Sequence, residues 1–267
     1  GTSAYAIAVP VAGAIALLII LVAVSYRQAI HAYPQGGGVY NVARENLGEM
    51  PALIGAASLL IDYVLTTAVS VAAGIAAITS AFPALFPHHV AIGIAVIVLH
   101  AWANLRGVRE SGKLFTMPTY AFLVVFFAFI GYGVWRHVMG TFPVFSTPTD
   151  AALPSAGIAV GVLLILRAFA SGCTAMTGIE ATSNGVPAFQ PPAAKNASTT
   201  LMRMAFLLGG IFLGITLLTF WGRVVPSHDE TVVSQIARGL FGSGVFYYIV
   251  QAATARILLL AANTPFA

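Results

Sequence analysis

Charged residues are scarce in this chain of 267 residues: 7% are Asp, Glu, Lys or Arg, whereas 59% are hydrophobic. An ordinary soluble domain has about 25% charged residues, because it needs a polar surface in water. The 12 basic and 8 acidic residues cannot cover a soluble protein of this length. We therefore expect lipid to cover most of the surface, which makes the chain a piece of an all-α polytopic membrane protein.

Cysteine is almost absent as well, since Cys173 is the only one. An internal disulfide framework and a multi-thiolate metal site are therefore excluded. The sequence has no Walker or dinucleotide-binding glycine pattern, no HExxH pattern, and no nucleophile arranged with a base. We expect no cofactor, no transition metal and no enzyme activity. The basic residues lie scattered between apolar runs, so nucleic acid is not an expected partner.

Long apolar runs recur along the whole chain. A bilayer core about 30 Å thick needs about 20 residues of α-helix. We expect seven spans, at about 5–25, 51–82, 90–104, 115–138, 157–189, 199–221 and 240–262, of which the third is short. The second and fifth are long enough to tilt or to contain a break. No linker or short repeat divides the chain, so we expect one membrane domain over residues 1–267. Because it lacks an initiator methionine and stops directly after an apolar run, we expect it to be truncated at both ends.

The basic residues predict the orientation, since Lys and Arg accumulate on the cytoplasmic side of a membrane. The seven segments place on one side Arg27, Arg44, Arg106, Arg109, Lys113, Lys195 and Arg203. The other side has only Arg136, Arg223 and Arg238. We therefore expect the first side to be cytoplasmic and the loops 83–89, 140–154 and 226–230 to lie outside.

The fifth apolar segment contains residues that a continuous lipid-facing helix would not select. Five residues indicate that the helix is unwound near 171–178: Ser171, Gly172, Cys173, Thr174 and Gly178. A break at mid-membrane is tolerated only where the freed backbone is buried or lines a wet cavity. The two half-helix ends can then hold an ion or a small polar substrate. The alternative is that small residues only allow two helices to pack closely.

Glu180 lies in the same segment. An isolated carboxylate is costly in a membrane unless it is paired, hydrated or protonated. We therefore regard Glu180 as a candidate proton or cation carrier. The alternative is a structural ion pair with Arg167, although a continuous helix would separate the two residues by about 20 Å.

The second apolar segment has three oxygen-bearing side chains on one helix face, because Tyr63, Thr66 and Ser70 are spaced i, i+3 and i+7. This stripe suits either a desolvated cation or a hydrogen-bonded substrate, and it equally suits contacts between helices. Asp62 lies on a different face, as a buried partner or a second proton site.

We interpret the remaining polar features as structural rather than functional. The glycine-rich stretch 33–40 is typical of a tight connection or hinge at the cytoplasmic end of two helices. His88 and His89 indicate a solvated turn, and His100 a packing residue. The sequon at Asn196 falls on the cytoplasmic side, where it would not be glycosylated.

Three stretches resemble a known family. Residues 25–48, which contain Tyr-Pro-Gln-Gly-Gly-Gly-Val-Tyr, resemble the loop after the second helix of amino acid-polyamine-cation (APC) superfamily permeases. Residues 58–74, 167–172 and 177–189 are similar to the KimA-like branch of the KUP potassium-proton symporters. The resemblance covers essentially the whole chain. It implies a LeuT-type fold, a five-plus-five inverted repeat whose first and sixth helices are broken, of which this chain would contribute the second to eighth helices.

The resemblance also implies site residues. Tyr63, Thr66, Ser70, Thr177 and Glu180 match potassium-site and coupling positions of that branch. It therefore implies a secondary active transporter for proton-coupled potassium uptake across the cytoplasmic membrane of a bacterium. A permease for amino acids or other small organic solutes is the alternative, and a membrane sensor or assembly subunit without transport is a further one.

The expected partners are the lipid bilayer and the transported potassium ion and proton, or a small organic solute. A homodimer is left open. Two departures from the family stand out: its first helix and the helices beyond the eighth are absent, and Arg256 occupies an apolar position in the last span.

Overall fold

The computed structural model describes residues 2–36, 38–106, 112–145 and 162–263. Arg109, Gly37, residues 146–154 of a predicted outer loop and residues 157–161 of the fifth apolar segment lie outside the described residues. All regular secondary structure in the described residues is helical. Five helices there are long and apolar enough to cross a membrane. The expectation of an all-α polytopic membrane protein is confirmed.

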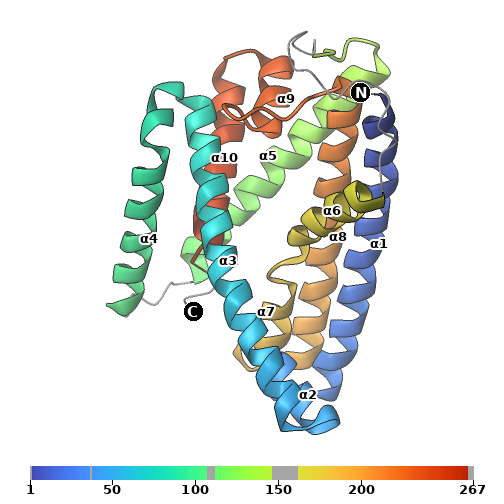
Figure 1. The fold of residues 1–267 in the computed structure, drawn as a ribbon, viewed down its shortest axis with the longest axis vertical. Coiled ribbons are helices and arrows are strands. Elements are labelled where there is room, and N and C mark those ends of the chain that lie inside the picture. Colours follow the sequence, from blue (N-terminus) through green and yellow to red (C-terminus); the bar gives the residue numbers. More distant parts are fainter. Residues whose placement is uncertain (1, 37, 107–111, 146–161, 264–267) are drawn as a thin grey trace. The chain divides into compact units, whose positions relative to one another are not determined.

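The α-helices are α1 (Thr2–Ala32), α2 (Gly38–Leu47), α3 (Glu49–Ala81), α4 (His89–Leu105), α5 (Gly112–Val138), α6 (Val162–Gly172), α7 (Ile179–Asn184), α8 (Ala193–Gly222), α9 (Val232–Phe241) and α10 (Val245–Ala261). Three short 3₁₀ helices lie between them, η1 (Pro83–His88), η2 (Cys173–Met176) and η3 (Val186–Ala188). Each of the seven apolar segments contains at least one α-helix, and α3 is continuous where a break was one option (Figure 1).

Two helices, α2 and α9, lie outside the apolar segments. Each has only 10 residues, and neither is apolar all round. In α9, Ile236, Ala237 and Leu240 are buried on one face. A helix of this length is too short to span a bilayer, so the criterion of an apolar run of membrane-spanning length does not predict it.

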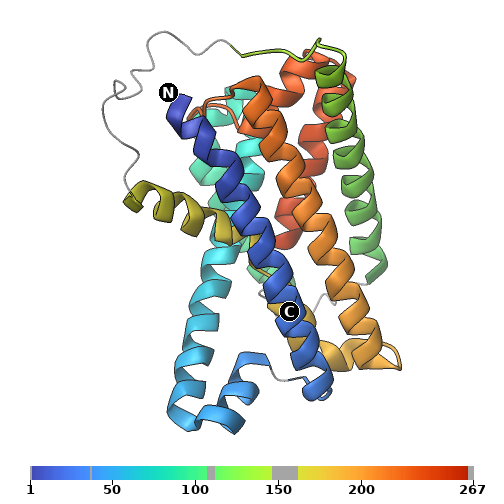
Figure 2. The ribbon, with the colours of Figure 1, turned by 90° about the vertical axis from the view of Figure 1, so that its right-hand side faces the viewer.

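The helices form two compact units, which are described separately. Unit 1 comprises Gly1–Asp62 with Leu153–Thr216, and unit 2 comprises Tyr63–Ala152 with Leu217–Ala267. Within unit 1, α1 and α8 run side by side (Figure 2).

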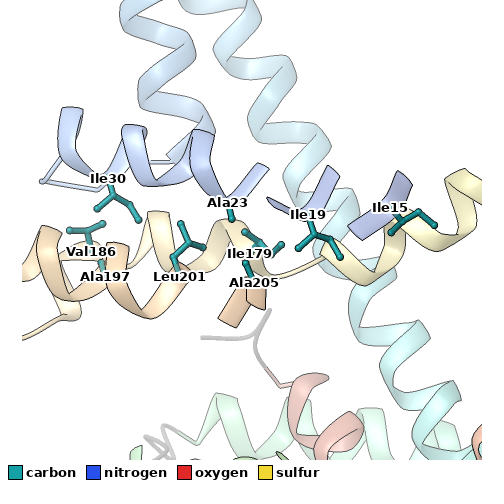
Figure 3. Packing of buried hydrophobic residues seen from close by; sticks show 9 residues of the cluster. All are labelled: Ile15, Ile19, Ala23, Ile30, Ile179, Val186, Ala197, Leu201 and Ala205. Carbon is teal, nitrogen blue, oxygen red and sulfur yellow. The ribbon is translucent and has the colours of Figure 1, made fainter. Parts of the chain in front are cut away.

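The core of unit 1 joins α1 to α7, η3 and α8. Its buried members are Ile15, Ile19, Ala23, Ile30, Ile179, Val186, Ala197, Leu201 and Ala205 (Figure 3). Along α1 the buried positions recur every three or four residues, which places them on one face of the helix. Burying one aliphatic side chain of this size stabilises a fold by about 1.5–3 kcal/mol. The core therefore holds the short helix α7 between two long ones.

Unit 2 contains the C-terminal part of α3 together with α4, α5, α9 and α10. The helices α5 and α10 pack together, and Phe126 and Phe129 of α5 are buried. At one end of the unit, the Tyr247 hydroxyl of α10 donates to the Ser80 carbonyl oxygen of α3 at 2.9 Å. At the other end, the Asn104 side chain of α4 donates to Asn263 at 2.5 Å.

The histidines singled out from the sequence form local contacts. The imidazole Nδ1 of His100 hydrogen-bonds to the Val96 carbonyl oxygen at 2.8 Å, and that of His89 bonds to Phe86 at 2.6 Å. His88 ends η1. Within the described residues, no three His, Cys, Asp or Glu side chains are grouped so that they could hold a metal ion.

Candidate functional site

The chain is unwound between α6 and α7. The helix α6 ends at Gly172, the 3₁₀ turn η2 follows, and Thr177 is extended with φ −58° and ψ 131°. Gly178 then precedes α7 with φ +94°. Of the residues predicted to form the unwound stretch, Ser171 and Gly172 are the last residues of α6, Cys173 and Thr174 begin η2, and Gly178 directly precedes α7.

Local chemistry accounts for this interruption. A φ near +94° is a backbone conformation that glycine adopts readily and other residues rarely do, so Gly178 directs the chain out of the α-helical path. The Thr174 hydroxyl donates to the Ser171 carbonyl oxygen, a bond that competes with the helical ladder. The interruption exposes peptide groups that a continuous helix would pair with one another.

Glu180 lies in the first turn of α7 and is partly buried. Both of its carboxylate oxygens accept from the Gly178 backbone N–H, at 3.0 and 3.2 Å. The Asp62 carboxylate, also in unit 1, interacts electrostatically with it. Within the described residues an ion pair joins Arg238 to Glu230, and none joins Glu180 to Arg167.

The oxygen stripe lies on the continuous helix α3. Tyr63, Thr66 and Ser70 are all half-buried, whereas Val64 and Leu65 are exposed. These residues belong to unit 2, whereas Thr177 and Glu180 belong to unit 1. The residues of the predicted site are therefore divided between the two units, and each group is described within its own unit. Arg256 lies exposed on α10.

A second polar cluster, which the sequence did not reveal, joins α3, α9 and α10 in unit 2. The Arg238 guanidinium donates to Glu230 at 3.0 Å, to the Tyr247 hydroxyl at 2.9 Å and to the Ser80 carbonyl oxygen at 3.1 Å. Ser234 is fully buried and bonds to Glu230 and Tyr247. These five residues are called the outer cluster below.

Arg238 lies outside the spans predicted from the sequence. Burial lowers the pKa of its guanidinium, but Glu230 and Tyr247 together outweigh this effect and raise the pKa above its usual value. A raised arginine pKa means that the charge is lost only in strongly alkaline solution. The Arg238–Glu230 pair therefore keeps its positive partner throughout the physiological pH range.

An all-α membrane chain with a helix interrupted within an apolar segment has the architecture of a secondary transporter. A sequence model described as amino acid permease matches residues 1–267. The chain belongs to this amino acid permease family, which confirms the resemblance to APC superfamily permeases.

Among curated proteins, the chain is similar to the potassium transporter KimA of Bacillus subtilis (strain 168). The two are 48% identical over 264 residues, which are 99% of this chain and 43% of that protein. The chain thus spans less than half the length of this relative.

Proposed function

We propose that the protein containing this chain takes up potassium together with protons across the cytoplasmic membrane of a bacterium. The observation that carries the proposal is the 48% identity, over almost the whole chain, to a protein named a potassium transporter. The interruption before Glu180 adds physical support, because a desolvated cation needs oxygen ligands that a continuous apolar helix does not offer.

In this proposal, the hydroxyls of Tyr63, Thr66 and Ser70 bind the dehydrated potassium ion together with Thr177 and with carbonyl oxygens of the unwound stretch. The stripe on α3 supports this role, since its oxygens share one helix face of suitable spacing.

Glu180 exchanges the proton. Its carboxylate is held by the N–H of Gly178, so it is fixed in place without an ion pair to a basic side chain. A carboxylate of this kind can alternate between a charged and a neutral form as the ion and the proton arrive. Alternating access would come from rocking of one helix bundle against another.

The test measures rubidium-tracer uptake by the complete reading frame in bacteria that lack their own potassium transporters. With Glu180→Gln, we expect the part of uptake that depends on the proton gradient to fall to background, because the amide cannot take up and release a proton. Glu45→Gln, an exposed acid on α2, is the matched control and should behave as the wild type. Unchanged gradient-dependent uptake with Glu180→Gln would exclude the coupling role.

A second candidate function is a permease for amino acids or other small organic solutes, which the description of the matching family favours. The same uptake assay separates the two. Potassium uptake that excess potassium blocks and amino acids do not block supports the cation transporter. Uptake of labelled amino acids without rubidium uptake supports the permease. A homodimer stays a prediction.

A further inference from the structure

Residues 33–36 and 38, the described part of the glycine-rich loop, are called the glycine loop below and contact the C-terminal end of α7. Gly36 and Gly38 both have a positive φ, +74° and +49°. A Cβ atom on Gly36 would lie 2.7 Å from the Asn184 carbonyl oxygen and 3.0 Å from Pro187 Cδ. A Cβ atom on Gly38 would overlap the Asn184 side-chain oxygen. The loop therefore needs glycine here both for its backbone path and for its close approach to α7.

The glycine loop is itself held from two sides. The Gly36 N–H donates to the Tyr33 carbonyl oxygen at 3.0 Å, which closes a turn after α1. The Asn46 side chain of α2 donates to the Tyr33 hydroxyl at 2.8 Å, which ties α2 to the end of α1. One turn before the loop, Ile30 of α1 lies next to Val186 in the core of unit 1 (Figure 3).

The contact at Asn184 bears on Glu180 because the two residues lie one turn apart on α7, about 6 Å along the helix axis. This helix has only 6 residues. Its N-terminal end is anchored by Ile179, which is buried between α1 and α8. A helix this short does not absorb a displacement by bending, so a shift at Asn184 tilts α7 about Ile179 and turns the neighbouring Glu180 side chain.

We propose that the glycine loop has a positioning role in transport. It holds the C-terminal end of α7 in place and thereby sets the position of the Glu180 carboxylate. This proposal rests on the proposed role of Glu180 as the proton carrier. It gives a role to a glycine-rich motif that the sequence indicated only as a tight connection or hinge.

The decisive variant is Gly38→Ala in the complete reading frame. The added methyl group overlaps the Asn184 side-chain oxygen and lies 2.7 Å from Asn184 Cγ, so Asn184 at the end of α7 has to shift. We expect the maximal rate of rubidium uptake to fall about tenfold at equal amounts of protein in the membrane, and its dependence on pH to shift, because a small misplacement of a reacting group is costly.

Gly48→Ala is the matched control. Gly48 also has a positive φ, +95°, but no atom lies within 4 Å of the position that its Cβ would occupy. Gly48→Ala strains the backbone, but its added methyl group overlaps no other atom. We therefore expect this variant to keep the wild-type pH profile of uptake. The double variant Gly38→Ala with Asn184→Ala removes the oxygen that the methyl group would meet, so uptake and pH profile should return toward those of Asn184→Ala alone.

A second readout does not depend on transport. Cys173 lies in η2, five residues before Gly178, and its labelling rate with a small maleimide reports on the unwound stretch in a protein whose other cysteines are replaced. We expect Gly38→Ala to change this rate and Gly48→Ala to leave it unchanged.

Equal effects of Gly38→Ala and Gly48→Ala, or a wild-type pH profile and labelling rate with Gly38→Ala, would overturn the positioning role. Failure of the proposed function gives a different result: Glu180→Gln then leaves gradient-dependent uptake unchanged, while the labelling rates still report whether the glycine loop seats α7.

Discussion

At the scale of single residues, the Tyr247 hydroxyl shows how polar groups are satisfied in a chain with so few charges. It is almost fully buried, and it bonds to the Ser80 carbonyl oxygen, to Ser234 and to Arg238. Buried polar groups are costly unless they are hydrogen-bonded. This one oxygen atom therefore bonds to three of the other four residues of the outer cluster.

Replacing Tyr247 by Phe should lower the stability of the purified protein by about 1–3 kcal/mol, because the ring still fills its place while the buried partners of the hydroxyl lose their bond. The melting temperature in detergent at neutral pH measures this loss. Tyr248→Phe is the matched control: the neighbouring side chain is 41% exposed, and its loss should cost less than about 0.5 kcal/mol. Equal melting temperatures for the two variants would show that the cluster adds no stability.

The sequence revealed some residues and not others for a physical reason. Glu180 stands out because a carboxylate within an apolar run is rare and costly. The bond from Arg238 to the Ser80 carbonyl oxygen joins positions 158 residues apart, and no local spacing predicts such a pair. The contact of Asn184 with the glycine loop is equally non-local.

At the scale of elements, the hydrophobicity and length of a segment predict directly that it forms a helix. An interruption within that helix is predicted only indirectly, from residues that disfavour a continuous helix. Five of the seven apolar segments predicted from the sequence lie on helices long enough to cross a bilayer, because the bilayer imposes both length and composition. The fifth and seventh segments contain shorter helices. The short helices α2 and α9 were not predicted, because each has only 10 residues. An interruption in the fifth segment could be predicted because glycines and hydroxyls are unusual together in a membrane span. Its bounds could not, since Ser171 and Gly172 belong to α6 and Cys173 and Thr174 to η2, and neither could the conformation of Gly178.

Gly178→Ala tests that element. Alanine at φ +94° is strained by about 1–2 kcal/mol, so the chain should relax toward a regular helix and rotate Glu180 away from its place. We expect gradient-dependent uptake to fall severalfold in cells with equal amounts of membrane protein. The control is Gly209→Ala in α8, which also has open space around its Cβ position but lies within a helix, where alanine should stabilise by about 0.5–1 kcal/mol. Wild-type uptake by Gly178→Ala would mean that the left-handed conformation is not needed.

At the scale of the whole molecule, the distribution of basic residues predicts the orientation, and each unit is consistent with it. In unit 1 the C-terminal end of α1, α2 and the N-terminal end of α8 lie together (Figure 1), and these elements carry Arg27, Arg44 and Lys195. In unit 2 the Thr231 N–H donates to the Ser80 hydroxyl at 3.0 Å, so two of the predicted outer loops lie at one end of that unit.

Thiol accessibility tests this orientation. In a background that lacks other cysteines, including Cys173, we expect His228→Cys to react with a membrane-impermeant maleimide in intact cells. Lys195→Cys should react only after the cells are permeabilised. Both side chains are exposed, so a difference between them reflects the side of the membrane rather than burial. The reverse pattern would place the glycine loop and the C-terminal end of α7 on the outside.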